Sequence, residues 1–157
     1  MTQSPDGTAA RMIEVANGEI GYIEEIGNLT KYGKEFGVNG KPWCGSFINW
    51  CAKAAHVEIP KVISTIDGAK SFKTKGQWFV APKVGDLVFF DFHPDDKTIV
   101  EHIGLVIKVG ETSIVTIEGN TSPLDQSNGG MVQMKTRKIG PHSYVVGYGR
   151  PPYLGEK

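Results

Sequence analysis

Four side chains spread along the chain have the residue types needed to cleave an acyl bond: Cys44, His102, Glu118 and Asn120. Residues 42–51, PWCGSFINWC, predict the start of a very apolar helix with the cysteine in its first turn, because a proline suits the beginning of a helix. A helix N-terminus favours the thiolate over the thiol. A thiolate at Cys44 would be a nucleophile that needs a base, and a histidine with a nearby acid would supply it.

His102 is the base that strand pairing selects. Residues 100–109 and 113–119 predict two strands joined through Gly110 and Glu111. With a three-residue connection, Lys108 faces Thr112, and His102 lies opposite Glu118. A one-residue slip would move Glu118 to the other face of the sheet.

These positions suggest a division of roles. Cys44 would attack a carbonyl carbon, and His102 would act as general base and acid. Glu118 would accept from the distal ring N–H and orient the imidazole, with Asn120 as a support or as the alternative partner. N–H groups at the start of the helix are available to an oxyanion.

Other polar and aromatic residues suggest less. Cys51 lies two turns into the apolar stripe of the same helix and fits a small buried hydrophobe. Trp43 is either a core residue or part of a substrate groove, and we take it as a tentative substrate-binding residue. The acidic residues of the 86–96 segment lack the alternating oxygen ligands and central glycine of a calcium loop. We therefore expect no metal site and no cofactor.

The order of elements predicts an α+β fold, in which N-terminal helices pack on an antiparallel sheet. Helices are expected over residues 8–26, weakened at Gly18 and Gly21, over 43–56, and in a short stretch around 67–73. Residues 27–41 read as a loop. Strands are expected over residues 87–92, 100–109, 113–119, 131–138 and 144–148. Residues 1–157 form one expected domain, with its core at about 8–153 and 151–157 as the start of a linker.

Composition excludes several classes of protein. With 39% hydrophobic residues, 22% charged residues and a formal net charge of zero, the chain has an ordinary globular composition and no basic field for nucleic acid. No apolar run approaches the ~20 residues needed to cross a membrane. Two cysteines seven positions apart on one helix are too distant for a disulfide. We expect free thiols, a monomer, and no signal peptide in residues 1–7.

Four motifs together resemble the CHAP domain, the cysteine, histidine-dependent amidohydrolase/peptidase. They are PWCGSFINWC (42–51), VGDLVFF (84–90), EHIGLV (101–106) and IEGNT (117–121), and the similarity extends over about residues 8–153. The resemblance implies a papain-like fold that hydrolyses amide bonds of bacterial peptidoglycan. The family's cysteine and histidine match Cys44 and His102, and its acid and following amide match Glu118 and Asn120.

The resemblance extends to phage endolysins, through residues 31–33 and 147–151. Such enzymes often lack a signal peptide, which implies a protein held in the host cytoplasm until a holin releases it to the cell wall. Two features depart from the family pattern. Residues 31–41 do not supply the acidic calcium loop that some members carry, and no wall-binding module is visible.

Three hypotheses follow. The leading one is a peptidoglycan hydrolase, either an endopeptidase or an N-acetylmuramoyl-L-alanine amidase, and the sequence does not decide between them. The alternatives are an inactive wall-binding module, and a cysteine peptidase or acyl transferase that acts on another substrate.

Overall fold

The computed structural model describes residues 2–95 and 97–156, over which the helices precede the strands. The helices are α1 (Ala9–Asn17), α2 (Lys31–Glu35), α3 (Cys44–Ala55) and α4 (Thr65–Thr74). The strands are β1 (Trp78–Phe79), β2 (Leu87–Phe90), β3 (His102–Val109), β4 (Ser113–Thr121), β5 (Met131–Lys138) and β6 (Val145–Gly149). The α+β fold class is confirmed.

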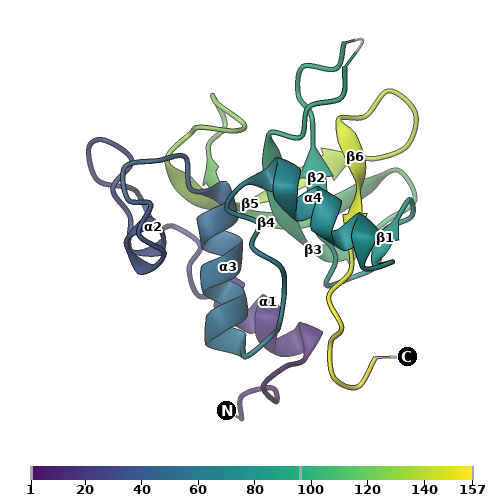
Figure 1. Cartoon of the computed structure of the whole chain (residues 1–157), viewed down its shortest axis with the longest axis horizontal. Coiled ribbons are helices and arrows are strands. Elements are labelled where there is room, and N and C mark those ends of the chain that lie inside the picture. Colours follow the sequence, from purple (N-terminus) through teal and green to yellow (C-terminus); the bar gives the residue numbers. More distant parts are fainter. Residues whose placement is uncertain (1, 96, 157) are drawn as a thin grey trace.

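The described strands form one antiparallel sheet in the order β1-β6-β2-β3-β4-β5. Helix α3 contacts β3, β4 and α1. The first turn of α3 lies at the end of the sheet where the long β2–β3 and β4–β5 loops emerge (Figure 1). The start of β3 and the end of β4 are therefore close to this turn.

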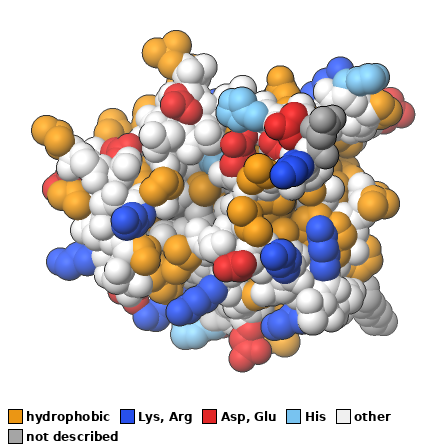
Figure 2. Space-filling model, turned by 45° about the horizontal axis from the view of Figure 1, so that its top comes forward, with side chains coloured by type: hydrophobic (Ala, Val, Ile, Leu, Met, Phe, Trp, Pro, Cys, Tyr) orange, Lys and Arg blue, Asp and Glu red, His pale blue; other side chains and the backbone are white. Residues whose placement is uncertain are grey.

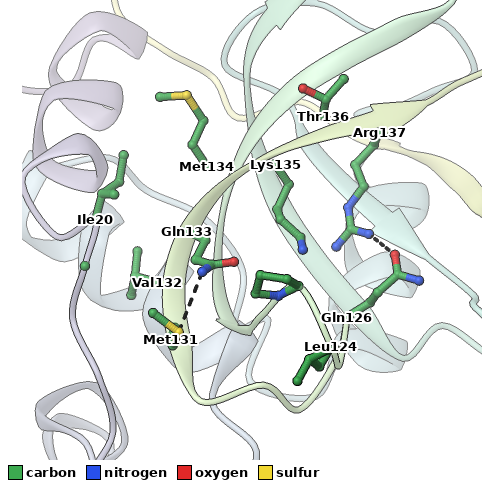
Figure 3. A pocket seen from close by; sticks show the side chains of 12 residues that line it. Ile20, Leu124, Gln126, Met131, Val132, Gln133, Met134, Lys135, Thr136 and Arg137 are labelled. Carbon is green, nitrogen blue, oxygen red and sulfur yellow. Dashed lines mark hydrogen bonds between the residues drawn. The ribbon is translucent and has the colours of Figure 1, made fainter.

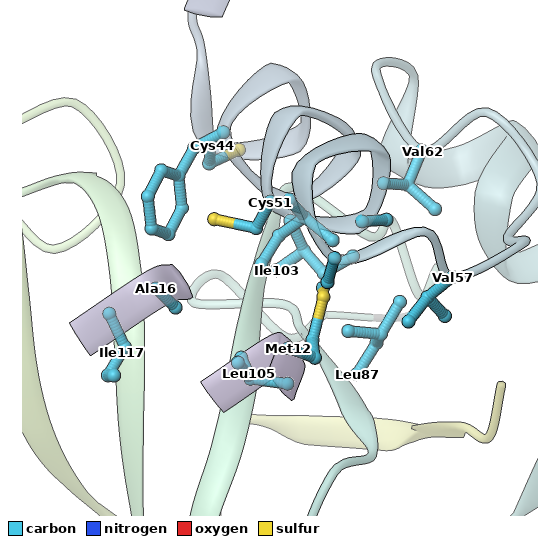
Figure 4. Packing of buried hydrophobic residues seen from close by; sticks show 14 of the residues in the cluster. Met12, Ala16, Cys44, Cys51, Val57, Val62, Leu87, Ile103, Leu105 and Ile117 are labelled. Carbon is cyan, nitrogen blue, oxygen red and sulfur yellow. The ribbon is translucent and has the colours of Figure 1, made fainter. Parts of the chain in front are cut away.

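Two apolar clusters divide the sheet by face. The larger one fills the space between the helices and the sheet, and Figure 4 shows Met12, Cys51, Leu87, Ile103, Leu105 and Ile117 within it. The smaller one covers the opposite face and is centred on Val88, Phe90, Val106, Ile114 and Tyr148. Alternate residues of β3 belong to different clusters, as a period of two requires.

Three details differ from the sequence predictions. The helix expected over residues 8–26 ends at Asn17, because Gly18 forms its C-cap. The segment expected to be a loop contains α2, whose start is fixed by the Thr30 side chain accepting from the Gly33 N–H. Strand β1 was not expected, since only two residues pair there with β6.

Charged side chains are distributed without a dominant sign. In the face shown in Figure 2, Lys and Arg side chains are interspersed with Asp and Glu side chains, in keeping with the net charge of zero. Among the described residues, no helix is long and apolar enough to cross a membrane.

Candidate active site

Cys44 is the first residue of α3, and its side chain is 6% exposed. Trp43 precedes it as the N-cap and makes no side-chain capping bond, so the first N–H groups of the helix are not occupied by a cap. Gly119 of β4 lets this turn approach the sheet closely. A Cβ atom at Gly119 would lie 2.7 Å from Phe47 Cβ and 2.9 Å from the Trp43 ring.

His102 is the first residue of β3, and it is fully buried. Its Nε2 lies 2.8 Å from Glu118 Oε1, so the ring donates from Nε2 to the carboxylate. Nδ1 has no hydrogen-bond partner among the described residues. In neutral imidazole the Nδ1 lone pair is then free to take a proton from the thiol of Cys44.

The pairing of β3 with β4 differs by two residues from the predicted register. Leu105 pairs with Ile117 and Val106 with Thr116. Continued along the strands, this register sets Glu118 opposite Gly104 and not opposite His102. A shift of two leaves both side chains on one face, so the imidazole and the carboxylate still meet as diagonal neighbours.

Gly104 makes that diagonal contact possible. A Cβ atom at this position would lie 2.7 Å from Glu118 Cγ and 3.3 Å from the carboxylate carbon. The absent side chain leaves the space into which Glu118 extends toward His102.

Arg137 of β5 is a site residue that sequence reasoning missed. Its Nε donates to Glu118 Oε2 at 2.9 Å, and its Nη2 donates to Glu118 Oε1. Thr116 Oγ1 also donates to Glu118 Oε2, at 2.5 Å. Arg137 pairs with Ile114, four residues along β4 from Glu118, so only the long side chain brings the two charges together.

Asn120 lies next to the site but serves the β4–β5 loop. Its Oδ1 accepts from the Gly130 N–H at 3.1 Å, and its Nδ2 donates to Asn128 at 3.2 Å. Its φ of 56° turns the backbone at the end of β4. The group bonded to the His102 ring is Glu118, so the geometry does not favour Asn120 as the alternative orienting residue.

Trp43 belongs to the core, which corrects the tentative assignment to a substrate groove. Its side chain is fully buried and stacks on Tyr32, with ring centroids 5.4 Å apart. The aromatic rings of Tyr22 and Tyr32 cover it, so it presents no surface to a substrate.

The buried charges of the site shift its titrations in opposite directions. Burial disfavours the imidazolium of His102, but the neighbouring Cys44 and Glu118 side chains outweigh burial and raise the pKa of His102 to about 9. Burial also disfavours the carboxylate of Glu118, but Arg137 and His102 lower its pKa to about 2. Glu118 is therefore ionised and His102 is a cation at neutral pH.

Cys51 lies in different surroundings. It is fully buried in the larger cluster, and burial raises the pKa of its thiol well above the ordinary value. Both cysteines are free thiols, as the sequence predicts. Among the described residues, no group of three or more His, Cys, Asp or Glu side chains is arranged to hold a metal ion.

Comparisons with known proteins bear on the family and the fold of the chain. The sequence model of the CHAP domain matches residues 36–120, which include Cys44, His102, Glu118 and Asn120. The comparison with curated proteins gave no match. Among solved structures, the chain resembles a lipoprotein-like protein of the NLP/P60 family from Staphylococcus aureus subsp. aureus Mu50, with a TM-score of 0.54 and 15% identity.

That likeness covers 95% of this chain and 43% of the staphylococcal protein, so the chain spans less than half of its structural neighbour. At this identity the likeness concerns the fold, and it supports the papain-like α+β class.

Proposed function

Because the chain belongs to the CHAP domain family, a family of cell-wall hydrolases and peptidases, we propose that it hydrolyses an amide bond of bacterial peptidoglycan. The observation that carries the proposal is the placement of His102. Its Nε2 is bonded to Glu118, while its Nδ1 is left without a hydrogen bond beside Cys44 at the start of α3. A nucleophile, a base and an orienting acid in this order are the parts of a cysteine hydrolase.

The first half of the reaction forms an acyl-enzyme. The thiolate of Cys44 attacks the carbonyl carbon of the amide, and the uncapped N–H groups of the first turn of α3 stabilise the oxyanion. His102 gives its Nδ1 proton to the leaving nitrogen, and the C–N bond breaks. The products are a free amine and a thioester on Cys44.

The second half restores the enzyme. Neutral His102 takes a proton from water through Nδ1, and the resulting hydroxide attacks the thioester carbon. The C–S bond breaks, the carboxylic acid leaves, and Cys44 returns as a thiolate beside the imidazolium. Glu118 accepts from Nε2–H in both halves and so holds one ring orientation throughout.

The site is consistent with two kinds of cut, an endopeptidase cut within the peptides or an amidase cut at N-acetylmuramoyl-L-alanine. Purified peptidoglycan should be digested with the protein, and the products should be analysed by mass spectrometry and labelling of new amino termini. New amino groups on stem residues other than L-alanine, or on cross-bridge residues, identify an endopeptidase. Free L-alanine amino termini, together with muramic acid that no longer carries a peptide, identify an amidase.

A protein substrate digested in parallel separates the remaining alternatives. Cleavage of protein but not of wall would indicate a general cysteine peptidase. Binding to wall without release of fragments would indicate an inactive wall-binding module. We further propose that the enzyme is a phage endolysin that acts at the wall after release from the host cytoplasm, a role supported only by the motif resemblance of residues 31–33 and 147–151.

A further inference from the structure

Glu118 is a fully buried carboxylate with contacts to two cations. Oε1 accepts from His102 Nε2 and from Arg137 Nη2, and Oε2 accepts from Arg137 Nε and Thr116 Oγ1. An ionised carboxylate in such surroundings is stable only while it is paired and hydrogen-bonded.

The proposed reaction removes one of the two cations during each cycle. When the imidazolium gives its proton to the leaving nitrogen, His102 becomes neutral. Among the residues that the structure describes, Arg137 is then the cation left in contact with Glu118, because the nearby Lys135 Nζ donates to the Ser122 carbonyl at 3.0 Å. Without Arg137, Glu118 would be driven to take a proton, and a protonated acid no longer holds the Nε2–H tautomer.

Arg137 is itself held in one position. Its side chain is 8% exposed, and the guanidinium carbon lies 5.1 Å from the Phe90 ring centroid and 5.0 Å from that of Phe92. Nη1 donates to Gln126 Oε1 of the β4–β5 loop, and the two side chains point toward each other in Figure 3. The two aromatic rings and the Gln126 amide together fix the plane of the guanidinium group that donates two hydrogen bonds to Glu118.

We propose that Arg137 is a positioning residue of the active site, which keeps Glu118 ionised and directed at His102 through the whole catalytic cycle. The inference rests on the proposed cysteine hydrolase function. The groups that act on this network are Cys44 from α3, His102 from β3, and Arg137 with Lys135 from β5.

The test compares neutral and charged replacements of Arg137 across pH. In Arg137→Met and Arg137→Gln, removal of the positive charge should raise the pKa of Glu118 and move the acid limb of wall hydrolysis upward by about one pH unit or more. Arg137→Lys keeps the positive charge but loses the two-pronged hydrogen bonding of the guanidinium group. Its acid limb should therefore stay near that of wild type, while the rate drops about tenfold. The rate of Cys44 alkylation by iodoacetamide, measured over the same pH range, should show an acid limb that moves in the same way in each variant.

Arg150→Met is the matched control. Arg150 grips the buried Asp86 through Nε and Nη2 at 2.8 and 2.9 Å, a second two-pronged pair that lies outside the site. Its loss should lower thermal stability but leave the acid limb in place. Two results would overturn the proposal. One is a lower rate in both neutral Arg137 variants with the acid limb of the pH–rate profile unmoved. The other is an acid limb in Arg137→Lys that moves as far as in the neutral variants.

The pH dependence of Cys44 alkylation distinguishes a failure of this inference from a failure of the proposed function. If wild type releases no wall fragments while the neutral Arg137 variants still shift the alkylation limb, the proposed substrate is wrong and the role of Arg137 stands. If hydrolysis is present and neither limb moves, the role of Arg137 is wrong and the proposed function stands.

Discussion

The first and third turns of α3 each carry a cysteine, and the two thiols have opposite surroundings. Cys44 begins the helix, retains a small exposed area, and neighbours the buried cation of His102. Cys51 lies seven residues further on, fully buried among apolar side chains that raise the pKa of its thiol. Figure 4 shows Cys51 among the core residues and Cys44 near the end of the same helix.

Because both cysteines lie on one helix, we expect their reactivities to differ through their positions relative to the sheet. The helix interior packs on the apolar face that contains Ile103 and Leu105. The helix start reaches the strand ends, where His102 and Glu118 extend from the opposite face. Of the two thiols on this helix, the proposed function uses Cys44, whereas Cys51 packs in the core.

The strongest contrast is expected from replacing each cysteine by alanine. Cys44→Ala should reduce release of wall fragments by about 10³-fold or more, because the nucleophile is lost. Cys51→Ala should leave the rate within about threefold of wild type and lower the free energy of unfolding by about 1–2 kcal/mol, because it opens a small cavity. Fragment release and thermal unfolding measure the two effects.

Alkylation provides the control for that comparison. Native wild type should take one iodoacetamide group, on Cys44, and the Cys44→Ala protein should take none until it is unfolded. Labelling of Cys51 in the native Cys44→Ala protein would mean that the two thiols differ less than their burial indicates.

Glu118→Gln should give the next largest effect, a loss of about 10²-fold in the hydrolysis rate. Glutamine keeps the size of the side chain but removes the charge that stabilises the imidazolium and matches Arg137. Cys44 should remain open to alkylation, and Cys51 should remain protected. The reverse outcome, full activity in Glu118→Gln and an inactive Asn120→Ala, would transfer the orienting role to Asn120.

Much of this site could be predicted from the sequence. A cysteine at the start of an apolar helix, and a hairpin that sets His102 and Glu118 on one face, are both present. The register was wrong by two residues because the length of a turn cannot be deduced from residues 110–113. The strands resume pairing at Val109 and Ile114, and a bulge follows between Val106 and Lys108. Because the net shift is an even number of residues, the predicted face of each side chain is still correct.

Arg137 could not be predicted by the same reasoning. Cross-strand pairing assigns Gln133 as the neighbour of Glu118, whereas Arg137 lies opposite Ile114. The ion pair depends on a side chain long enough to pass Thr116 along the strand, and on rings that hold it there. Trp43 was tentatively assigned to a groove because Tyr32, which stacks on it, comes from a segment expected to be a loop.

The mildest effect is expected from alkaline pH, which titrates His102 beside Cys44 and leaves the buried Cys51 thiol protonated. The pKa of His102 is about 9, above its ordinary value, so the imidazolium and its contribution to stability are present at neutral pH and are lost as the pH rises through 9. Hydrolysis should therefore fall about tenfold per pH unit above this value, because the leaving nitrogen no longer receives a proton. Cys51→Ala should show the same alkaline limb as wild type, since burial keeps the Cys51 thiol protonated and unreactive in the folded protein. A limb that moves in Cys51→Ala would show that the two cysteines are coupled through α3, and the division between a reactive and a structural thiol would be wrong.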